Sequence, residues 1–354
     1  MRNDLERKEF SKILIIKPSS LGDVVRSLAI LGGLRGRFGR AHISWLVRPD
    51  CAAILRNNPH LDEIIEFNRR RWGNILCNIG AARDFWGFLS RMRRNGYDLV
   101  LDLQGLFRSA FISVATGAPV RVGFAGAREF APCFYTHRVT IPREPEHIVE
   151  SYWRFAHLLG FGQVEKRFEI PLDEAVIESA HKLLFENQLG AGEPYLVLLI
   201  GGTEAAKRWG VERFAALADA VYNRYHIRSV LLGAGSEENA AAGQVVKYAQ
   251  KEIINLVDKT GLEQAIAILR SARLVVGNDS GPLHLAAALS VPLVGLYGPT
   301  NPVVVGPYGQ LDNVVQAGPD QPRTQRYSLK LQHRMQNISV DEVLKTVNKK
   351  LRNK

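Results

Sequence analysis

Cysteine is scarce in this chain of 354 residues, and long apolar runs are missing. Cys51, Cys77 and Cys133 are odd in number and far apart, without a CxxC pair or zinc-site spacing, which fits a reducing cytosol. No run approaches the roughly 18 apolar residues of a membrane span. The charged start MRNDLERKEFSK leads into only four strongly apolar residues, so we expect neither a signal peptide nor a transmembrane segment.

Two nucleotide-binding signatures are also missing. No GxxxxGK[ST] occurs, which excludes an ordinary P-loop NTPase. The stretch LLGAGSEEN at 231–239 has a Gly-x-Gly turn, but Glu238 stands in place of the third glycine of the dinucleotide fingerprint, and the acids follow too closely. This argues against a dehydrogenase, although a carboxylate in this turn can still accept hydrogen bonds from ribose hydroxyls.

Positive charge is concentrated in the first half. The net charge is +11, and residues 1–170 hold 26 Lys and Arg against 17 Asp and Glu, whereas the remainder holds 20 against 18. Such a field favours an anionic partner, whether nucleic acid, a phosphorylated lipid surface or an acidic sugar. No helix-turn-helix, RNP or zinc-finger pattern accompanies the charge, so we expect no nucleic acid.

Short runs rich in Val, Ile and Leu alternate with helical patterns along the chain. Strands are predicted in the first half at 13–17, 42–47, 63–67 and 98–103, and in the second half at 195–200, 229–233, 254–257, 273–277 and 292–298. Helices are predicted between them, for example across 81–94 and from 105. This alternation predicts parallel sheets covered on both faces.

The length and the two series of strands predict two α/β domains. We expect a first Rossmann-like domain at 1–165, a helix-prone linker at 166–192, a second Rossmann-like domain at 193–335 and an amphipathic helix at 336–354. Ligand sites of doubly wound domains lie at the carboxyl ends of their strands, and here they should face each other across a cleft. Chemistry is therefore expected directly after the strands.

The stretch GNDSGPLHLAAAL at 277–289 follows a predicted strand and opens a helix. Ser280 and Gly281 can offer N–H groups and a hydroxyl to phosphate oxygens, and His284 can add a donor one turn later. Alternatively, Asp279 or Ser280 merely caps the helix and His284 packs in the core. These residues alone leave both interpretations open.

The stretch GGTEAAKRWG at 201–210 also follows a strand. Thr203 offers a hydroxyl, and Lys207 can place a positive charge on a phosphate. A solvated loop in which Trp209 anchors the next helix would explain the same residues.

Residues 69–94 combine seven arginines and four aromatic side chains with one acid, Asp84. Such a stretch can lie on an anionic membrane surface or hold a phosphorylated glycolipid. The alternative is a helix that packs its aromatic side chains on the sheet beneath a solvated arginine face.

Asp23, in KPSSLGDV at 17–24, follows the first predicted strand at the start of a helix. If a second domain holds an anionic leaving group, a carboxylate in this place suits a general base. A helix-favouring Asp in the first turn, with Ser19 or Ser20 as the cap, is the competing interpretation.

Seven separated stretches occur in a characteristic order: KPSSLGDV, FNRRRW, YDLVLDLQGLFRSA, AREFAPCFY, AAKRW, GNDSGPLHLAAAL and LYGPTNP. Together they resemble the lipopolysaccharide heptosyltransferases of glycosyltransferase family 9, closest to the heptosyltransferase I type, from residue 12 to about 310. The resemblance implies a GT-B architecture, an ADP-heptose donor, and an acceptor built on 3-deoxy-octulosonic acid attached to lipid A.

The resemblance also implies Asp23 as the catalytic base, and Arg69, Arg70, Arg71 and Gln104 as residues on the acceptor side. For the donor it implies that Thr203 and Lys207 contact the diphosphate, with Lys207 meeting the charge of the leaving group, and that Glu237, or else Glu238, is the ribose-binding acid. The phosphate motif that it implies consists of Asp279, Ser280, Gly281 and His284.

The expected reaction is a single displacement with inversion, without a required metal or other cofactor. The enzyme is expected in the cytoplasm, peripheral to the inner membrane and in contact with its anionic glycolipid acceptor. Another GT-B transferase with a different nucleotide sugar or acceptor is the first alternative. A two-domain protein that closes on an anionic ligand without turnover is the second.

Overall fold

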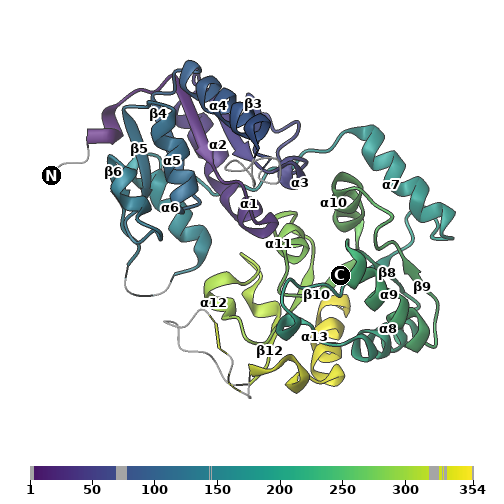
Figure 1. Ribbon diagram of the computed structural model, residues 1–354. Helices are drawn as coiled ribbons and strands as arrows, with labels where there is room; N and C mark the ends of the chain where they lie inside the picture. The colour runs from purple at the N-terminus through teal and green to yellow at the C-terminus, as the bar shows by residue number, and fades with distance from the viewer. Residues whose placement is uncertain are drawn as a thin grey trace. The chain divides into compact units, whose positions relative to one another are not determined.

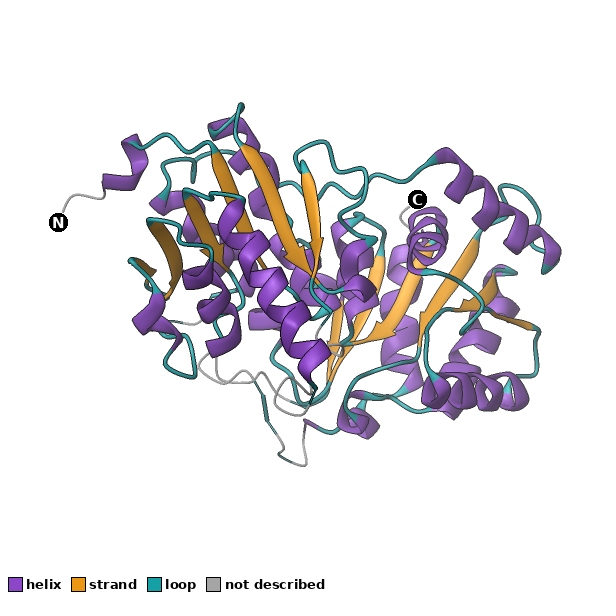
Figure 2. Cartoon of the chain, turned by 45° about the horizontal axis from the view of Figure 1, so that its top comes forward, coloured by secondary structure: helices purple, strands orange, loops and turns teal. Residues whose placement is uncertain are grey.

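A computed structural model describes residues 4–68, 78–142, 144, 146–318, 327–328, 330 and 333–352. The chain divides into two compact units. The N-terminal unit comprises Met1–Arg143 and Ile148–Pro171, and the C-terminal unit comprises Glu144–His147 and Leu172–Lys354. Each unit contains one sheet whose described strands run parallel (Figure 2).

The N-terminal sheet has the strand order β3-β2-β1-β4-β5-β6. Its strands are β1 (Lys12–Ile16), β2 (His42–Val47), β3 (Glu63–Glu66), β4 (Leu99–Asp102), β5 (Val120–Phe124) and β6 (His137–Val139). The helical segments of this unit are η1 (Asp4–Arg7), α1 (Leu21–Ser27), α2 (Ala29–Arg37), α3 (Pro49–Ala52), α4 (Ile79–Arg94), α5 (Phe107–Ala115), η2 (Ala131–Phe134) and α6 (Ile148–Leu158).

Helices cover both faces of the N-terminal sheet, because right-handed crossovers change face when the strand order changes direction (Figure 1). One face carries α1, α2 and α6, which contact one another. The other face carries α4 and α5, whose Phe88, Met92 and Ile112 share a buried cluster with Leu14 and Val100 of the central strands. Fully burying one such side chain contributes roughly 1.5–3 kcal/mol.

The C-terminal sheet repeats this plan in the order β12-β11-β10-β7-β8-β9. Its strands are β7 (Tyr195–Leu199), β8 (Arg228–Leu231), β9 (Ile253–Asn255), β10 (Leu274–Asn278), β11 (Leu293–Tyr297) and β12 (Val314–Gln316). Its helical segments are α7 (Glu174–Glu186), η3 (Ala205–Lys207), α8 (Val211–Tyr225), α9 (Ser236–Tyr248), α10 (Leu262–Ser271), α11 (Gly281–Ala288), α12 (Pro302–Val305), η4 (Leu311–Asn313), η6 (Met335–Asn337) and α13 (Val340–Arg352).

The end of the chain closes the core of the C-terminal unit. Val343 and Val347 of α13 are fully buried in one cluster with Trp209 and Phe214. The Trp209 indole N–H donates to the carbonyl of Ile338 at 2.8 Å. The amphipathic pattern at the end of the sequence therefore packs on α8 as part of this unit.

The strand order reverses beside the first strand of each sheet. In the N-terminal sheet the chain adds β2 and β3 on one side of β1 and then places β4 on the other side. In the C-terminal sheet it adds β8 and β9 beside β7 and then places β10 on the opposite side. At such a reversal the two following loops diverge and leave a crevice at the carboxyl ends of the strands, where doubly wound sheets bind ligands.

The doubly wound parallel sheets predicted from the sequence are confirmed. The structure adds three short strands that the sequence analysis did not identify, β5, β6 and β12. The helical segment after β1 is divided at Leu28 into α1 and α2.

Gly277 of β10 offers a test of core packing, because a Cβ there would lie 2.6 Å from Cβ of Leu199 on the neighbouring strand. We expect Gly277→Ala to lower the free energy of unfolding by about 1–3 kcal/mol through overpacking. Gly243, in the middle of α9, has nothing within 4 Å of such a Cβ. Gly243→Ala should therefore stabilise the chain by about 0.5–1 kcal/mol. Thermal unfolding measures both, and equal shifts would contradict the packing argument.

Candidate functional site

Asp279 is the centre of a buried polar cluster at the strand-order reversal of the C-terminal sheet. It follows β10, and its carboxylate accepts hydrogen bonds from Lys207 Nζ at 3.0 Å and Thr300 Oγ1 at 2.9 Å. The ring nitrogen Nε2 of His284 lies 3.2 Å from its other oxygen. Loops after β7, β10 and β11 thus converge on one carboxylate.

The cations beside Asp279 keep it ionised inside the protein. Burial alone would raise the pKa of Asp279, but the hydrogen bond from His284 and the positive charges of His284 and Lys207 outweigh it. The pKa of this carboxyl therefore lies well below its ordinary value. Asp279 in turn fixes the positions of the ammonium and the imidazole.

Asn278 joins the two loops beneath this cluster. Its side chain is fully buried, and its amide donates to the carbonyls of Ile200 at 2.7 Å and Gly201 at 3.1 Å. Its oxygen accepts from the backbone N–H of Trp209 at 3.2 Å. The loop that carries Lys207 is consequently held at the end of β10.

Ser280 occupies the N-cap position of α11, but its side chain makes no capping hydrogen bond. Its hydroxyl oxygen is buried and has no hydrogen-bond partner among the residues that the structure describes. Gly281 begins the helix and Pro282 follows in its first turn, where a missing N–H costs nothing. The helix start thus presents an unused hydroxyl together with the positive end of the helix dipole, an arrangement suited to a phosphate.

The remaining candidate residues of the C-terminal unit, Thr203, Glu237 and Glu238, differ in burial. Thr203 is exposed in the loop after β7. Glu237 is exposed and pairs with Arg208 at 2.6 Å. Glu238 lies between Gly201 and Gly233, where a Cβ on either glycine would overlap its carboxylate. Burial raises the pKa of Glu238 although backbone N–H groups bind its carboxylate.

Asp23 lies in the first turn of α1, at the strand-order reversal of the N-terminal sheet. Its carboxylate accepts hydrogen bonds from Arg26 at 2.9 Å and from the Ser20 hydroxyl at 3.2 Å. Lys17 Nζ lies 3.9 Å away and is almost completely buried. The hydroxyl of Ser20 thus binds the Asp23 side chain, although Ser20 occupies the N-cap position.

Gln104 follows β4, the other strand at this reversal. The turn is held by Asp102, which is fully buried and accepts from the backbone N–H groups of Gln104 at 2.9 Å and Gly105 at 3.1 Å. The Tyr135 hydroxyl donates to the same carboxylate at 2.7 Å. Desolvation raises the pKa of Asp102. The side-chain oxygen of Gln104 is buried and makes no hydrogen bond within the described part of the chain.

The basic stretch divides into two sets of side chains. Arg69, Arg70 and Arg71 lie outside the described residues. In α4, Phe88 is buried in the core and Phe85 packs against it, whereas Trp86 is exposed. The core-packing interpretation therefore holds for Phe85 and Phe88 but not for Trp86.

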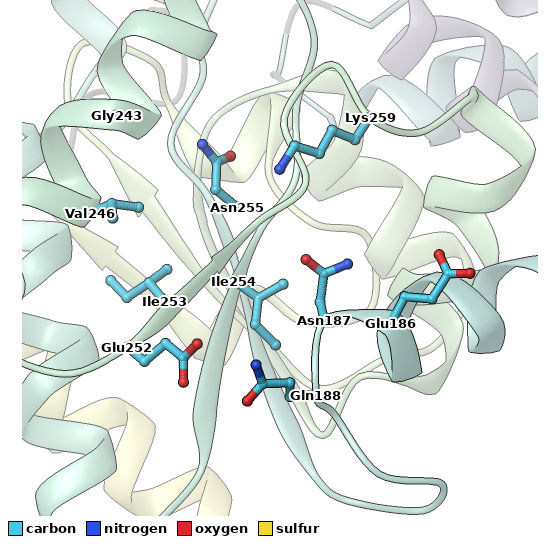
Figure 3. A pocket seen from close by; sticks show the side chains of 10 residues that line it. All are labelled: Glu186, Asn187, Gln188, Gly243, Val246, Glu252, Ile253, Ile254, Asn255 and Lys259. Carbon is cyan, nitrogen blue, oxygen red and sulfur yellow. The ribbon is translucent and has the colours of Figure 1, made fainter.

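A separate cavity of about 390 Å³ lies in the C-terminal unit along its edge strand β9. Polar and charged side chains make up most of its lining (Figure 3). None of the candidate residues that the structure describes lines it. It is therefore distinct from the cluster around Asp279.

Among the residues that the structure describes, no group of three or more His, Cys, Asp or Glu side chains is arranged to hold a metal ion. In the same ranges, every helix is too short or too polar to cross a membrane.

Sequence reasoning missed several residues that build these two sites. Thr300 lies in the LYGPTNP stretch and Tyr135 in AREFAPCFY, so the motifs were recognised but the contacts were not. Lys17 and Arg26 flank Asp23 in the sequence, and their basic side chains close to an acid were the available signal.

Comparisons with known proteins identify similar chains. The family model described as glycosyltransferase family 9 (heptosyltransferase) matches residues 85–334. Lipopolysaccharide heptosyltransferase 1 of Pseudomonas aeruginosa is 29% identical over 302 residues, 84% of this chain and 82% of that protein.

Two solved structures show the same fold over nearly the whole chain. The family 9 glycosyltransferase of Veillonella parvula superimposes with a TM-score of 0.84 at 24% identity, covering 98% of this chain and 99% of the other. The E. coli heptosyltransferase WaaC with ADP gives 0.77 at 26% identity, covering 96% and 99%.

The lowered pKa of Asp279 makes its contribution to stability depend on pH. A carboxyl whose folded pKa is depressed stabilises the fold above its unfolded pKa of 3.8, and the contribution is lost as pH falls further. We expect Asp279→Asn to lower the free energy of unfolding by about 1–3 kcal/mol at pH 7. The difference from wild type should persist to about pH 5 and shrink below about pH 4.

Thermal unfolding of both proteins across this range measures the effect. Asp312→Asn, at an exposed position on η4, is the matched control and should change little. A deficit in Asp279→Asn that stays the same from pH 7 to about pH 3.5 would contradict the assignment.

Proposed function

Because this chain belongs to glycosyltransferase family 9, the heptosyltransferases, we propose that it transfers heptose from ADP-heptose to the 3-deoxy-octulosonic acid inner core of lipid A. The resemblance found in the sequence is thereby confirmed, and the protein is a glycosyltransferase of the heptosyltransferase type with a GT-B fold. The observation that carries the proposal is the polar cluster at Asp279, beside the unpaired hydroxyl of Ser280.

The donor diphosphate binds at the start of α11. Ser280 donates its hydroxyl, and the backbone N–H of Gly281 at the helix start donates to the phosphate oxygens. Lys207 places its ammonium nearby, and Thr203 adds an exposed hydroxyl from the same loop. Asp279 does not meet the phosphates itself, since a carboxylate would repel them; it positions Lys207 and His284.

The reaction is an inverting single displacement. Asp23 accepts the proton of the acceptor hydroxyl as the oxygen forms a bond to the anomeric carbon of heptose. The bond from that carbon to the phosphate oxygen breaks, and ADP departs with the electron pair. Lys207 and the α11 terminus stabilise the charge that develops on the leaving phosphate, which is electrostatic catalysis by preorganised groups.

The surroundings of Asp23 support its role as the base. Ser20 and Arg26 hold the carboxylate by hydrogen bonds, and Lys17 lies close to it, so the side chain is oriented for proton transfer. Gln104, with its unpaired side-chain oxygen, binds the acceptor together with Arg69, Arg70 and Arg71.

Protein groups balance the negative charge of the donor diphosphate, and no metal is required. For the ribose we retain Glu237, with Glu238 as the alternative, because Glu237 lies on the surface whereas Glu238 fills the space between two glycine turns. The enzyme works in the cytoplasm at the inner-membrane surface, where a lipid-anchored acceptor is accessible.

Asp23→Asn tests the base. The variant keeps the shape of the side chain but cannot take a proton, so we expect turnover to fall by about 10²–10⁴-fold while the protein remains folded. Transfer to a delipidated inner-core acceptor measures it, with Asp50→Asn as control because Asp50 also lies in a first helical turn after a strand. Near-normal turnover in Asp23→Asn would refute the assignment.

Lys207→Ala tests the diphosphate contact. Loss of the ammonium should lower kcat/KM for ADP-heptose by about 10²–10³-fold and affect acceptor KM much less. Lys259→Ala, at an exposed lysine of the same unit, should behave like wild type. Unchanged donor kinetics in the Lys207 variant, or transfer from a UDP-sugar in preference to ADP-heptose, would count against the proposed donor.

A further inference from the structure

The outer side of α4, α5 and η2 exposes an unusual amount of apolar surface, and we call it the α4–α5–η2 surface. It carries Ile79, Trp86, Phe107 and Phe130, which are 89%, 63%, 49% and 84% exposed. The first two lie on α4, the third begins α5 and the fourth precedes η2. Helices α4 and α5 contact each other, and α5 contacts η2, so the segments that carry the four side chains adjoin one another. Figure 1 labels α4 and α5 in the N-terminal unit.

Helix α4 carries apolar side chains on two opposite sides, one of which is buried and the other exposed. Phe88, Leu89 and Met92 are buried against the sheet. Ile79 and Trp86, seven positions apart, lie on one stripe of the opposite side. A helix that packs on a core normally presents a polar outer face, so the exposed pair requires another explanation.

The helix starts bring three of these apolar side chains to the same edge of the sheet. In a parallel sheet each covering helix begins at the carboxyl ends of the strands, which places Ile79, Phe107 and Phe130 at that edge. Phe107 is supported by Phe111, which stacks with it at 6.3 Å, and by Phe134, which contacts it edge to face at 5.6 Å. The apolar edge therefore rests on packed aromatic side chains.

Charge on this surface is almost entirely positive. Helix α4, helix α5 and residues 128–134 carry two acids, Asp84 and Glu129, against six exposed arginines, namely Arg83, Arg91, Arg93, Arg94, Arg108 and Arg128. Arg83 and Arg94 fall on the same stripe of α4 as Trp86. Trp and other apolar side chains among arginines are typical of protein surfaces that lie in the headgroup region of an anionic bilayer.

We propose that the α4–α5–η2 surface docks the enzyme on an anionic phospholipid bilayer. The apolar side chains enter the boundary between headgroups and acyl chains, and the arginines pair with lipid phosphates. A second copy of this chain is a poorer occupant, because a two-fold contact would oppose arginines with arginines. This inference deepens the proposed function and rests on it for the lipid anchor of the acceptor.

Vesicle flotation tests the surface. Wild type should float with vesicles of phosphatidylcholine and phosphatidylglycerol in equal parts, but not with phosphatidylcholine alone, and binding should fall at about 1 M salt. The double variants Ile79→Ser/Trp86→Ser and Arg83→Gln/Arg94→Gln should each lower partition to the anionic vesicles by about tenfold or more. The controls Phe185→Ser on α7 and Lys247→Gln on α9 should float like wild type.

Activity on a soluble, delipidated acceptor separates this inference from the proposed function. All four variants should transfer heptose to that acceptor at the wild-type rate, whereas absence of transfer by wild type would contradict the function and leave the flotation result standing. Three results would overturn the docking surface: wild type without preference for anionic vesicles, double variants that float like wild type, or self-association of wild type that Ile79→Ser/Trp86→Ser abolishes.

Discussion

The reversal of strand order beside β1 and beside β7 is the constraint on which the candidate residues depend. A right-handed crossover fixes the face that each helix covers, and a change of direction leaves the two central loops without a helix between them. Asp23 and Gln104 follow the two strands of the first reversal. Lys207 and Asp279 follow the two strands of the second. The strand order alone therefore places residues that are distant in sequence at the ends of neighbouring strands.

The two units bury an acid at these positions in physically different ways. Asp102 is surrounded by neutral donors, two backbone N–H groups and a tyrosine hydroxyl, and its pKa is raised. Asp279 is surrounded by an ammonium, an imidazole and a threonine hydroxyl, and its pKa is lowered. The first carboxyl shapes a turn, whereas the second maintains a charge and holds cations beside it. Both are structural supports for neighbouring groups.

Apolar runs bounded by turns were sufficient to predict the strands that carry the candidate sites, because β1 beyond Lys12 and the whole of β7 are buried and consist mostly of Val, Ile and Leu. The strands β6 and β12 have three residues each and half-buried positions, so their patterns were too short to distinguish from loops. Partnerships such as Thr300 with Asp279 link separate loops and follow from tertiary packing, which a local pattern does not encode.

The chain passes between the two units three times, because Glu144–His147 belongs to the C-terminal unit while Ile148–Pro171 returns to the N-terminal unit. During synthesis the ribosome must therefore release the segment up to Pro171 before α6 can complete the N-terminal unit. The hydrogen bond of His147 forms later still, because its ring binds the carbonyl of Gly306, which lies almost 160 residues further along the chain. Until α6 packs, the nascent polypeptide exposes the side of α1 and α2 that α6 later covers. A chaperone that binds exposed apolar surface therefore has its binding site during this interval.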